Sequence, residues 1–128
     1  MSNDILNEAL ELKEYMTKIR RHIHRYPELG MQEFETTKFV KKELETMGVE
    51  TVELKSKVGV LGIIRGTMRG GDRATALRAD MDALPIAEET KLPYASKNIG
   101  VMHACGHDGH TTMLLGTAKM LIAKRNRF

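Results

Sequence analysis

The sequence of 128 residues has one cysteine, no tryptophan, three phenylalanines and three tyrosines. A single cysteine excludes an internal disulfide and is typical of proteins from a reducing compartment. So few aromatic side chains leave little surface on which nucleic-acid bases could stack. Acidic and basic residues are interspersed, with a net charge of only +3. We therefore expect no nucleic-acid partner.

Long apolar runs are also missing, because no stretch approaches the roughly 18 consecutive apolar residues of a membrane span. Met1–Ile5 shows no basic region followed by an apolar run, as a signal peptide would. We therefore expect a cytoplasmic protein without membrane contact. A chain of this length is predicted to form one domain that buries roughly two-thirds of its unfolded surface.

Apolar periodicity predicts two helices in the first part of the chain. The first begins at a cap on Ser2 or Asn3 and ends before Pro27, with an apolar stripe at Ile5, Ala9, Leu12, Met16, Ile19 and Ile23. The second covers residues 31–47 and is followed by Gly48, the residue type favoured just after a helix. Its inward side chains are predicted to be Phe34, Val40, Leu44 and Met47.

The pattern then changes to that of strands, which are predicted at 49–54, 58–65 and 74–80, with a hairpin turn at Gly70–Gly71–Asp72. A loop follows, and residues 111–124 are predicted to form a helix with Met113, Leu114, Ala118, Leu121 and Ile122 on its apolar side. This order predicts an α/β fold with a mixed sheet flanked by helices. No strand is predicted after the last helix, so the sheet is expected to be incomplete, with an uncovered apolar face and edge.

The segment His103-Ala-Cys-Gly-His-Asp-Gly-His110 holds the only cysteine and three of the five histidines. A thiolate and an imidazole at Cys105 and His107 suit Zn²⁺ or a similar divalent ion. Gly106 and Gly109 allow the backbone to turn so that the two side chains converge. The alternatives are a structural cysteine beside a surface histidine, and a Cys–His nucleophilic dyad. A two-residue spacing disfavours the dyad.

Three neighbours of this pair have open roles. Asp108 could cap the following helix, or hold the His107 ring by a hydrogen bond. His103 and His110 could support the site or face a substrate, or could simply be partly exposed polar residues. The whole cluster is predicted to lie at a helix N-terminus, where the helix dipole favours a thiolate or a carboxylate.

A second group of polar residues follows the third predicted strand. Asp80 and Asp82 are two residues apart, so both could point at one site, or they could cap the turn at the strand end. His22 and His24 are also two apart, but they lie on a predicted helix and therefore point to different sides. A metal shared by these two histidines is not expected.

Three blocks of this sequence resemble those of a known group of hydrolases: RRHIHRYPELGMQEF at 20–34, LRADMDALPI at 77–86 and PYASKNIGVMHACGHDGHTTMLLG at 93–116. The group contains the metal-dependent aminoacylases, hippurate hydrolases and carboxypeptidase-type enzymes. The resemblance runs over essentially the whole chain in the right order. The fold it implies is the N-terminal part of a zinc-peptidase-like catalytic domain.

The resemblance implies hydrolysis of an N-acyl amino acid or a small peptide-like substrate by metal-activated water. It implies two divalent metals per complete site, of zinc, manganese, cobalt or nickel, with Cys105 and His107 as ligands. Asp82 matches the aspartate that orients the active-site groups, and Asp80 replaces a histidine found there in the wider superfamily. Asp80 is then a supporting residue of less defined role. The full-length protein could be a homo-oligomer.

The same resemblance implies that part of the machinery lies outside residues 1–128. In this group the general base belongs to a later pair of adjacent glutamates, and Glu88–Glu89 lies in the wrong block for that role. The lid or dimerisation domain and the C-terminal half of the catalytic domain are also expected to be absent. We therefore expect the chain alone to be inactive. Two other hypotheses are a non-catalytic module that binds metal or pairs with a homologue, and a thiol-redox protein that uses Cys105.

Overall fold

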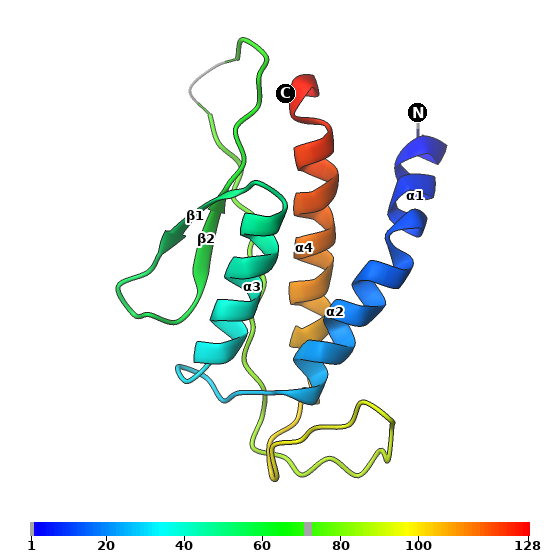
Figure 1. Cartoon of the computed structure of the whole chain (residues 1–128), viewed down its shortest axis with the longest axis vertical. Coiled ribbons are helices and arrows are strands. Elements are labelled where there is room, and N and C mark those ends of the chain that lie inside the picture. The colour runs from blue at the N-terminus through cyan, green and yellow to red at the C-terminus, as the bar shows by residue number, and fades with distance from the viewer. Residues whose placement is uncertain (1, 71–72) are drawn as a thin grey trace.

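The structure is a computed structural model that describes residues 2–70 and 73–128. Its elements are α1 (Ser2–Glu11), α2 (Lys13–Arg25), α3 (Phe34–Thr46), β1 (Glu50–Glu53), β2 (Val60–Ile63), α4 (His107–Ala123) and a final 3-10 turn (Arg125–Arg127). The helices α2, α3 and α4 lie side by side, and the β1–β2 hairpin lies on the outer side of α3 (Figure 1). The predicted α/β class is confirmed.

The core lies where the three long helices meet the start of the hairpin, and its buried apolar side chains are Ile19, Ile23, Val40, Leu44, Val49, Leu115 and Ala118. Helices α2 and α4 approach so closely that a Cβ on Gly116 would lie 3.0 Å from the sulfur of Met16. The predicted inward residues Ile5, Phe34 and Met113 are instead exposed, so these three predictions are wrong.

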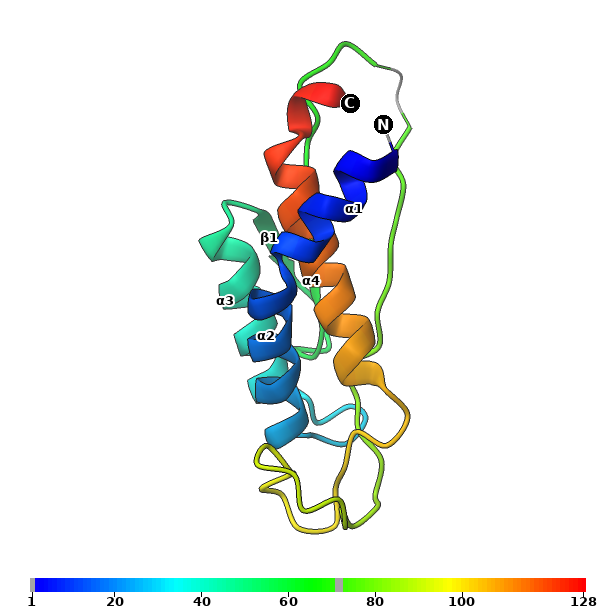
Figure 2. The ribbon, with the colours of Figure 1, turned by 90° about the vertical axis from the view of Figure 1, so that its right-hand side faces the viewer.

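The long N-terminal helix is interrupted at Leu12, which separates α1 from α2. The Leu12 N–H donates to the carbonyl of Ala9, 3.2 Å away, as in a tighter turn than the α-helix. The break lets α1 lean across α4, as Figure 2 shows, where Lys124 pairs with Glu8 at 2.6 Å. The prediction of one continuous helix is therefore wrong, whereas its end before Pro27 and the role of Gly48 (φ +77°) are confirmed.

The described residues contain one sheet, in which β1 and β2 pair antiparallel with Glu50 opposite Ile63. The strand predicted at 74–80 does not form: this segment is extended, but it is hydrogen-bonded to no described strand. It runs along α4 in the opposite direction (Figure 2), and its alternate residues from Thr75 to Met81 line an apolar cavity of about 580 Å³. Most of the predicted turn, at 71–72, lies outside the described residues.

The connection between α2 and α3 is held by one carboxylate. Glu28 accepts hydrogen bonds from the backbone N–H groups of Glu35 (3.1 Å) and Thr36 (2.6 Å), and from the Thr36 hydroxyl (2.7 Å). It thereby satisfies free donors of the first turn of α3, for which no adjacent residue provides a side-chain cap. Among the described residues, no helix has the length and apolarity needed to cross a membrane.

Candidate functional site

Three chain segments converge at the N-terminal end of α4. Leu29 bridges Ala83 in a parallel arrangement, and Leu84 bridges Met102 in an antiparallel one. The bridges are made by the Ala83 N–H with the Glu28 carbonyl (2.8 Å) and by two hydrogen bonds between Leu84 and Met102 (2.9 and 3.0 Å). As a result, Asp82 and the segment from His103 onward are held next to each other, although 20 or more residues separate them in sequence.

Asp82 holds the ring of His107. The Nδ1 atom of His107 lies 3.0 Å from the Oδ1 atom of Asp82 and 3.0 Å from its main-chain oxygen. This contact leaves Nε2 of the imidazole available for another ligand. Gly106 adopts φ +92°, a left-handed conformation that favours glycine, directly between His107 and the exposed free thiol of Cys105.

This donor set fits a divalent transition metal. A carboxylate on one ring nitrogen and a metal on the other is the usual arrangement of a ligating histidine. A thiolate beside an imidazole suits zinc and similar ions. Within residues 2–70 and 73–128, however, no three His, Cys, Asp or Glu side chains gather closely enough to form a metal site. Cys105 and His107 are therefore part of a ligand set at most.

Helix α4 begins at His107, earlier than the predicted start at residue 111, so His107 and Asp108 both lie in its first turn. Asp108 takes the first of the two roles that the sequence suggested only locally, because its Oδ1 atom accepts the Gly109 N–H of the first turn at 2.9 Å. It does not take the second, since the His107 ring is held by Asp82 instead. The Asp108 side chain is completely buried and turns toward α2, where Arg20 Nε donates to it at 3.2 Å.

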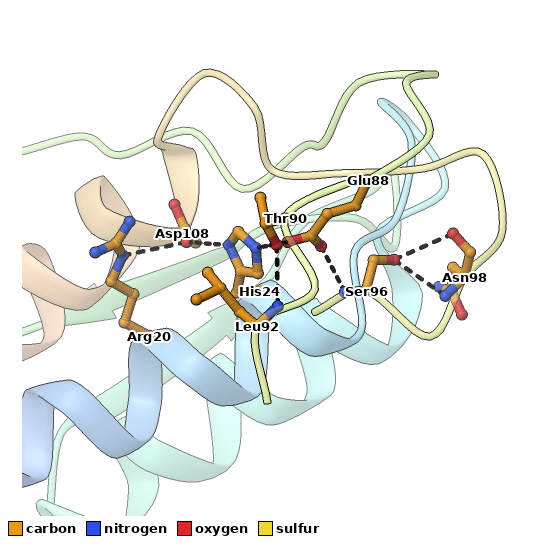
Figure 3. Close-up of polar contacts among 8 residues, drawn as sticks. All are labelled: Arg20, His24, Glu88, Thr90, Leu92, Ser96, Asn98 and Asp108. Atoms are coloured by element: carbon orange, nitrogen blue, oxygen red, sulfur yellow. Dashed lines mark hydrogen bonds and ion pairs between the residues drawn. The ribbon is translucent and has the colours of Figure 1, made fainter. Parts of the chain in front are cut away.

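A second contact to Asp108 comes from His24, as Figure 3 shows. The His24 ring is buried, with Nδ1 2.8 Å from Oδ2 of Asp108 and Nε2 3.1 Å from Oε1 of Glu88. The sequence did not predict that His24, Arg20 and Glu88 join Asp108 in one cluster. The only local signal was that Arg20 and His24 are four residues apart and so share one helix face.

Both carboxylates around His24 are favoured in their charged form. Burial alone would raise the pKa of Asp108, but hydrogen bonds from His24 and the Gly109 N–H, and the Arg20 charge, outweigh it, so the pKa is lowered. Burial would likewise raise the pKa of Glu88. Hydrogen bonds from Thr90, the Ser96 N–H and His24 outweigh that effect, and this pKa is also lowered.

The flanking histidines of the motif differ from each other. His103 is 4% exposed, so the prediction of a partly exposed residue is wrong, and neither ring nitrogen has a partner among the described residues. Burial lowers the pKa of His103. His110 is exposed, with its ring centroid 5.5 Å from that of His107.

The two aspartates of the second group also differ. Asp82 faces His107, whereas the Asp80 carboxylate pairs with the exposed Arg78, and the Asp80 carbonyl accepts a hydrogen bond from Thr111 (2.9 Å). The structure therefore does not bring both carboxylates to one point. His22 stacks on Phe39, with 4.1 Å between ring centroids, whereas the His24 ring contacts Asp108 and Glu88.

Comparison with known proteins gives a consistent result. A model of peptidase family M20/M25/M40 matches residues 76–128. The chain is 54% identical over 110 residues to the N-acetyl-L-cysteine deacetylase of Bacillus subtilis (strain 168), covering 86% of this chain and 26% of that protein. It is 49% identical over 116 residues to the N-acyl-L-amino acid amidohydrolase of Geobacillus stearothermophilus, covering 91% and 31%.

The chain is also similar to a solved structure. It is a Bacillus subtilis protein described as a dinuclear metal-binding peptidase of the M20 family, with a TM-score of 0.84 and 46% sequence identity. The match covers 88% of this chain and 32% of that chain. The chain thus spans less than a third of the length of each of these three proteins.

Proposed function

Because the chain belongs to peptidase family M20/M25/M40, we propose that it forms the N-terminal part of the catalytic domain of a metal-dependent amidohydrolase. The proposed substrates are N-acyl amino acids or related small amides, since two of the similar proteins are named for that activity. The observation that carries the proposal is the contact of Asp82 with Nδ1 of His107, beside the exposed thiol of Cys105.

In this proposal Cys105 and His107 are metal ligands, and Asp82 fixes the tautomer and the orientation of the His107 ring. The complete site would hold two divalent ions, of zinc, manganese, cobalt or nickel, which when bound polarise an amide carbonyl and lower the pKa of water. His110 lies beside His107 and is exposed, so it is placed to meet a substrate. Asp80 supports the site only through its main chain.

Other parts of the full site must come from outside the described residues, because these contain no group of three metal-binding side chains. Catalytic zinc sites normally have three protein ligands. We therefore expect the isolated chain to bind metal weakly and not to hydrolyse amides. Glu88 is not a general base in this proposal, since its carboxylate is directed at His24. The single cysteine supports the assignment to the cytoplasm.

A chimeric enzyme tests the proposed function. Residues of this chain replace the matching segment of the Geobacillus stearothermophilus amidohydrolase, to which they are 49% identical. We expect the chimera to hydrolyse N-acetyl and N-benzoyl amino acids, to lose this activity with a chelator and to regain it with Zn²⁺ or Co²⁺. The same chimera with Cys105→Ala should be at least about 100-fold less active, because a metal ligand is lost.

A well-folded chimera that hydrolyses none of these substrates, or that is indifferent to Cys105→Ala, would contradict the proposal. In the first case, the chain would better fit a non-catalytic metal-binding or homologue-pairing module. In the second, Cys105 would not be a ligand. A Cys105 thiol that forms a disulfide reversibly but binds no metal would favour the redox hypothesis instead.

A further inference from the structure

His24 is the one buried histidine of α2, and it lies between two carboxylates. The side chain of Glu88 is 3% exposed and that of Asp108 is fully buried. The His24 ring therefore joins a carboxylate of the loop at 86–99 to a carboxylate in the first turn of α4.

Two side chains of α2 share the Asp108 carboxylate, because Arg20, which is more exposed, also donates to it. Tyr94 meets the His24 ring edge-on, with 5.6 Å between centroids, and His103 lies 6.4 Å away without a hydrogen bond to it. Arg20, His24, Asp108 and Glu88 thus form one connected polar cluster.

Asp108 connects this cluster to the candidate metal site. It follows His107 directly, and its Oδ1 atom accepts the Gly109 N–H at 2.9 Å. Its main-chain oxygen accepts the Thr112 hydroxyl at 2.7 Å. The first turn of α4 is therefore fixed to α2 at Asp108, immediately beside the residue whose ring Asp82 orients. Movement of Asp108 would displace the backbone of His107.

We propose that His24 is a positioning residue that, through its hydrogen bond to Asp108, fixes the turn at 105–108 so that Cys105 and His107 face a common metal. This inference rests on the proposed function, since it assumes that these two residues are ligands. His24 itself is not a ligand in this arrangement, because both of its nitrogens are occupied by carboxylates. Its second bond, to Glu88, keeps the 86–99 loop over the ring.

Two isosteric substitutions separate the two bonds. In His24→Asn, the amide nitrogen takes the place of Nδ1 and can still donate to Asp108. In His24→Gln, the amide nitrogen takes the place of Nε2 and can donate only to Glu88. Both variants lose the ring and each keeps one of its two bonds, so a difference between them reports which bond, to Asp108 or to Glu88, supports metal binding. Circular dichroism of both variants checks that the helices are retained.

The first measurement is nitrogen-15 NMR of the histidine rings in the metal-free wild-type chain at pH 7. We expect a proton bound to Nδ1 of His24 that exchanges slowly with solvent, because it lies in the buried hydrogen bond to Asp108. An Nδ1 atom without a bound proton would overturn this hydrogen bond and with it the proposal. This measurement needs no metal and no substitution, so it stands even if a variant fails to fold.

The second measurement is the affinity of the chain for Co²⁺, followed by the thiolate-to-cobalt absorption band. We expect His24→Asn to bind within about threefold of wild type and His24→Gln to bind about tenfold more weakly, as for losses of other groups that support metal ligands. Equal affinities in the two variants would overturn the positioning role. A wild-type chain that binds no Co²⁺ would instead overturn the proposed metal site itself. The NMR signals of the His24 ring would still test its hydrogen bond to Asp108.

Discussion

At the scale of single residues, the two aspartates of the 80–82 segment have different environments although the sequence treats them alike. Asp82 contacts the ring of His107, while Asp80 pairs with the exposed Arg78. Exposed ion pairs contribute little to stability. A carboxylate on a ligating histidine, in contrast, raises the basicity of the ring and holds its tautomer. Only Asp82 is therefore expected to influence metal binding.

We predict that Asp82→Ala lowers the affinity of the chain for Co²⁺ by about 10- to 100-fold, because the His107 ring loses its carboxylate acceptor and keeps only the main-chain oxygen of residue 82. Asp80→Ala is the matched control and should change the affinity by less than about twofold. Titration of both variants by absorption spectroscopy makes the comparison. A larger effect of Asp80→Ala than of Asp82→Ala would show that the structure assigns the wrong carboxylate.

At the scale of elements, the site depends on a loop without regular structure that packs on the end of α2. Residues 86–99 are attached there by the Lys97 N–H to the Arg25 carbonyl (2.8 Å) and by the Asn98 amide to the Pro27 carbonyl (2.6 Å). Arg21 lies over the ring of Tyr94, 4.8 Å from its centroid. Glu88 is the buried anchor of this loop, because it also accepts the Ser96 N–H at 2.6 Å.

Substitution of Glu88 should therefore free the loop. We predict that in Glu88→Gln, trypsin cleaves after the exposed Lys91 and Lys97 about tenfold faster at pH 7.5, because hydrogen bonds to a buried charge are lost. Glu89→Gln is the control, since it removes the neighbouring, exposed carboxylate. Mass spectrometry of the fragments gives both rates. Equal rates in the two variants would mean that Glu88 does not hold the loop.

The buried Glu88 carboxylate also predicts a pH dependence of stability. The pKa of Glu88 is lowered from its ordinary value of 4.5, so the unfolded chain binds a proton more readily than the folded one. The stabilisation of the folded chain by the ionised Glu88 is then complete above about pH 4.5 and is lost as the pH falls through the folded-state pKa. The free energy of unfolding, measured with urea, should fall more steeply below that pH for the wild type than for Glu88→Gln. Parallel pH dependences in the two proteins would contradict this.

The local parts of the site could be predicted from sequence, and the long-range parts could not. Cys105 and His107 are two residues apart with a glycine between them, so their proximity follows from the chain itself. The contact of His24 with Glu88 joins residues 64 positions apart, through a loop that has no periodic pattern. Neither the apolar stripe of α2 nor the acidic pair at 88–89 indicates that they meet.

The wrong predictions of secondary structure have the same cause. Residues 74–80 have the composition of a strand, but a strand needs a hydrogen-bonded partner, and none of the described strands pairs with this segment. The apolar period from Ile5 to Ile23 is regular enough for one helix. The break at Leu12 depends on how α1 packs on α4, which the period does not encode.

At the scale of the whole molecule, the described residues form part of a site. The chain spans 26% to 32% of the length of the three proteins to which it was compared. Its described residues supply two candidate metal ligands, the aspartate that contacts one of them, and a polar cluster around His24 that we propose to fix the turn at 105–108. An apolar cavity of about 580 Å³ remains between α3, α4 and the extended segment.

The central claim is that Cys105 and His107 bind the same metal ion, and X-ray absorption of the zinc-loaded chain tests it most directly. We predict one sulfur at about 2.3 Å and imidazole nitrogen at about 2.0–2.1 Å from zinc. In Cys105→Ser the sulfur should disappear, while the imidazole contribution should remain. A first shell of oxygen and nitrogen alone in the wild type, with the Cys105 thiol still open to alkylation, would contradict the account.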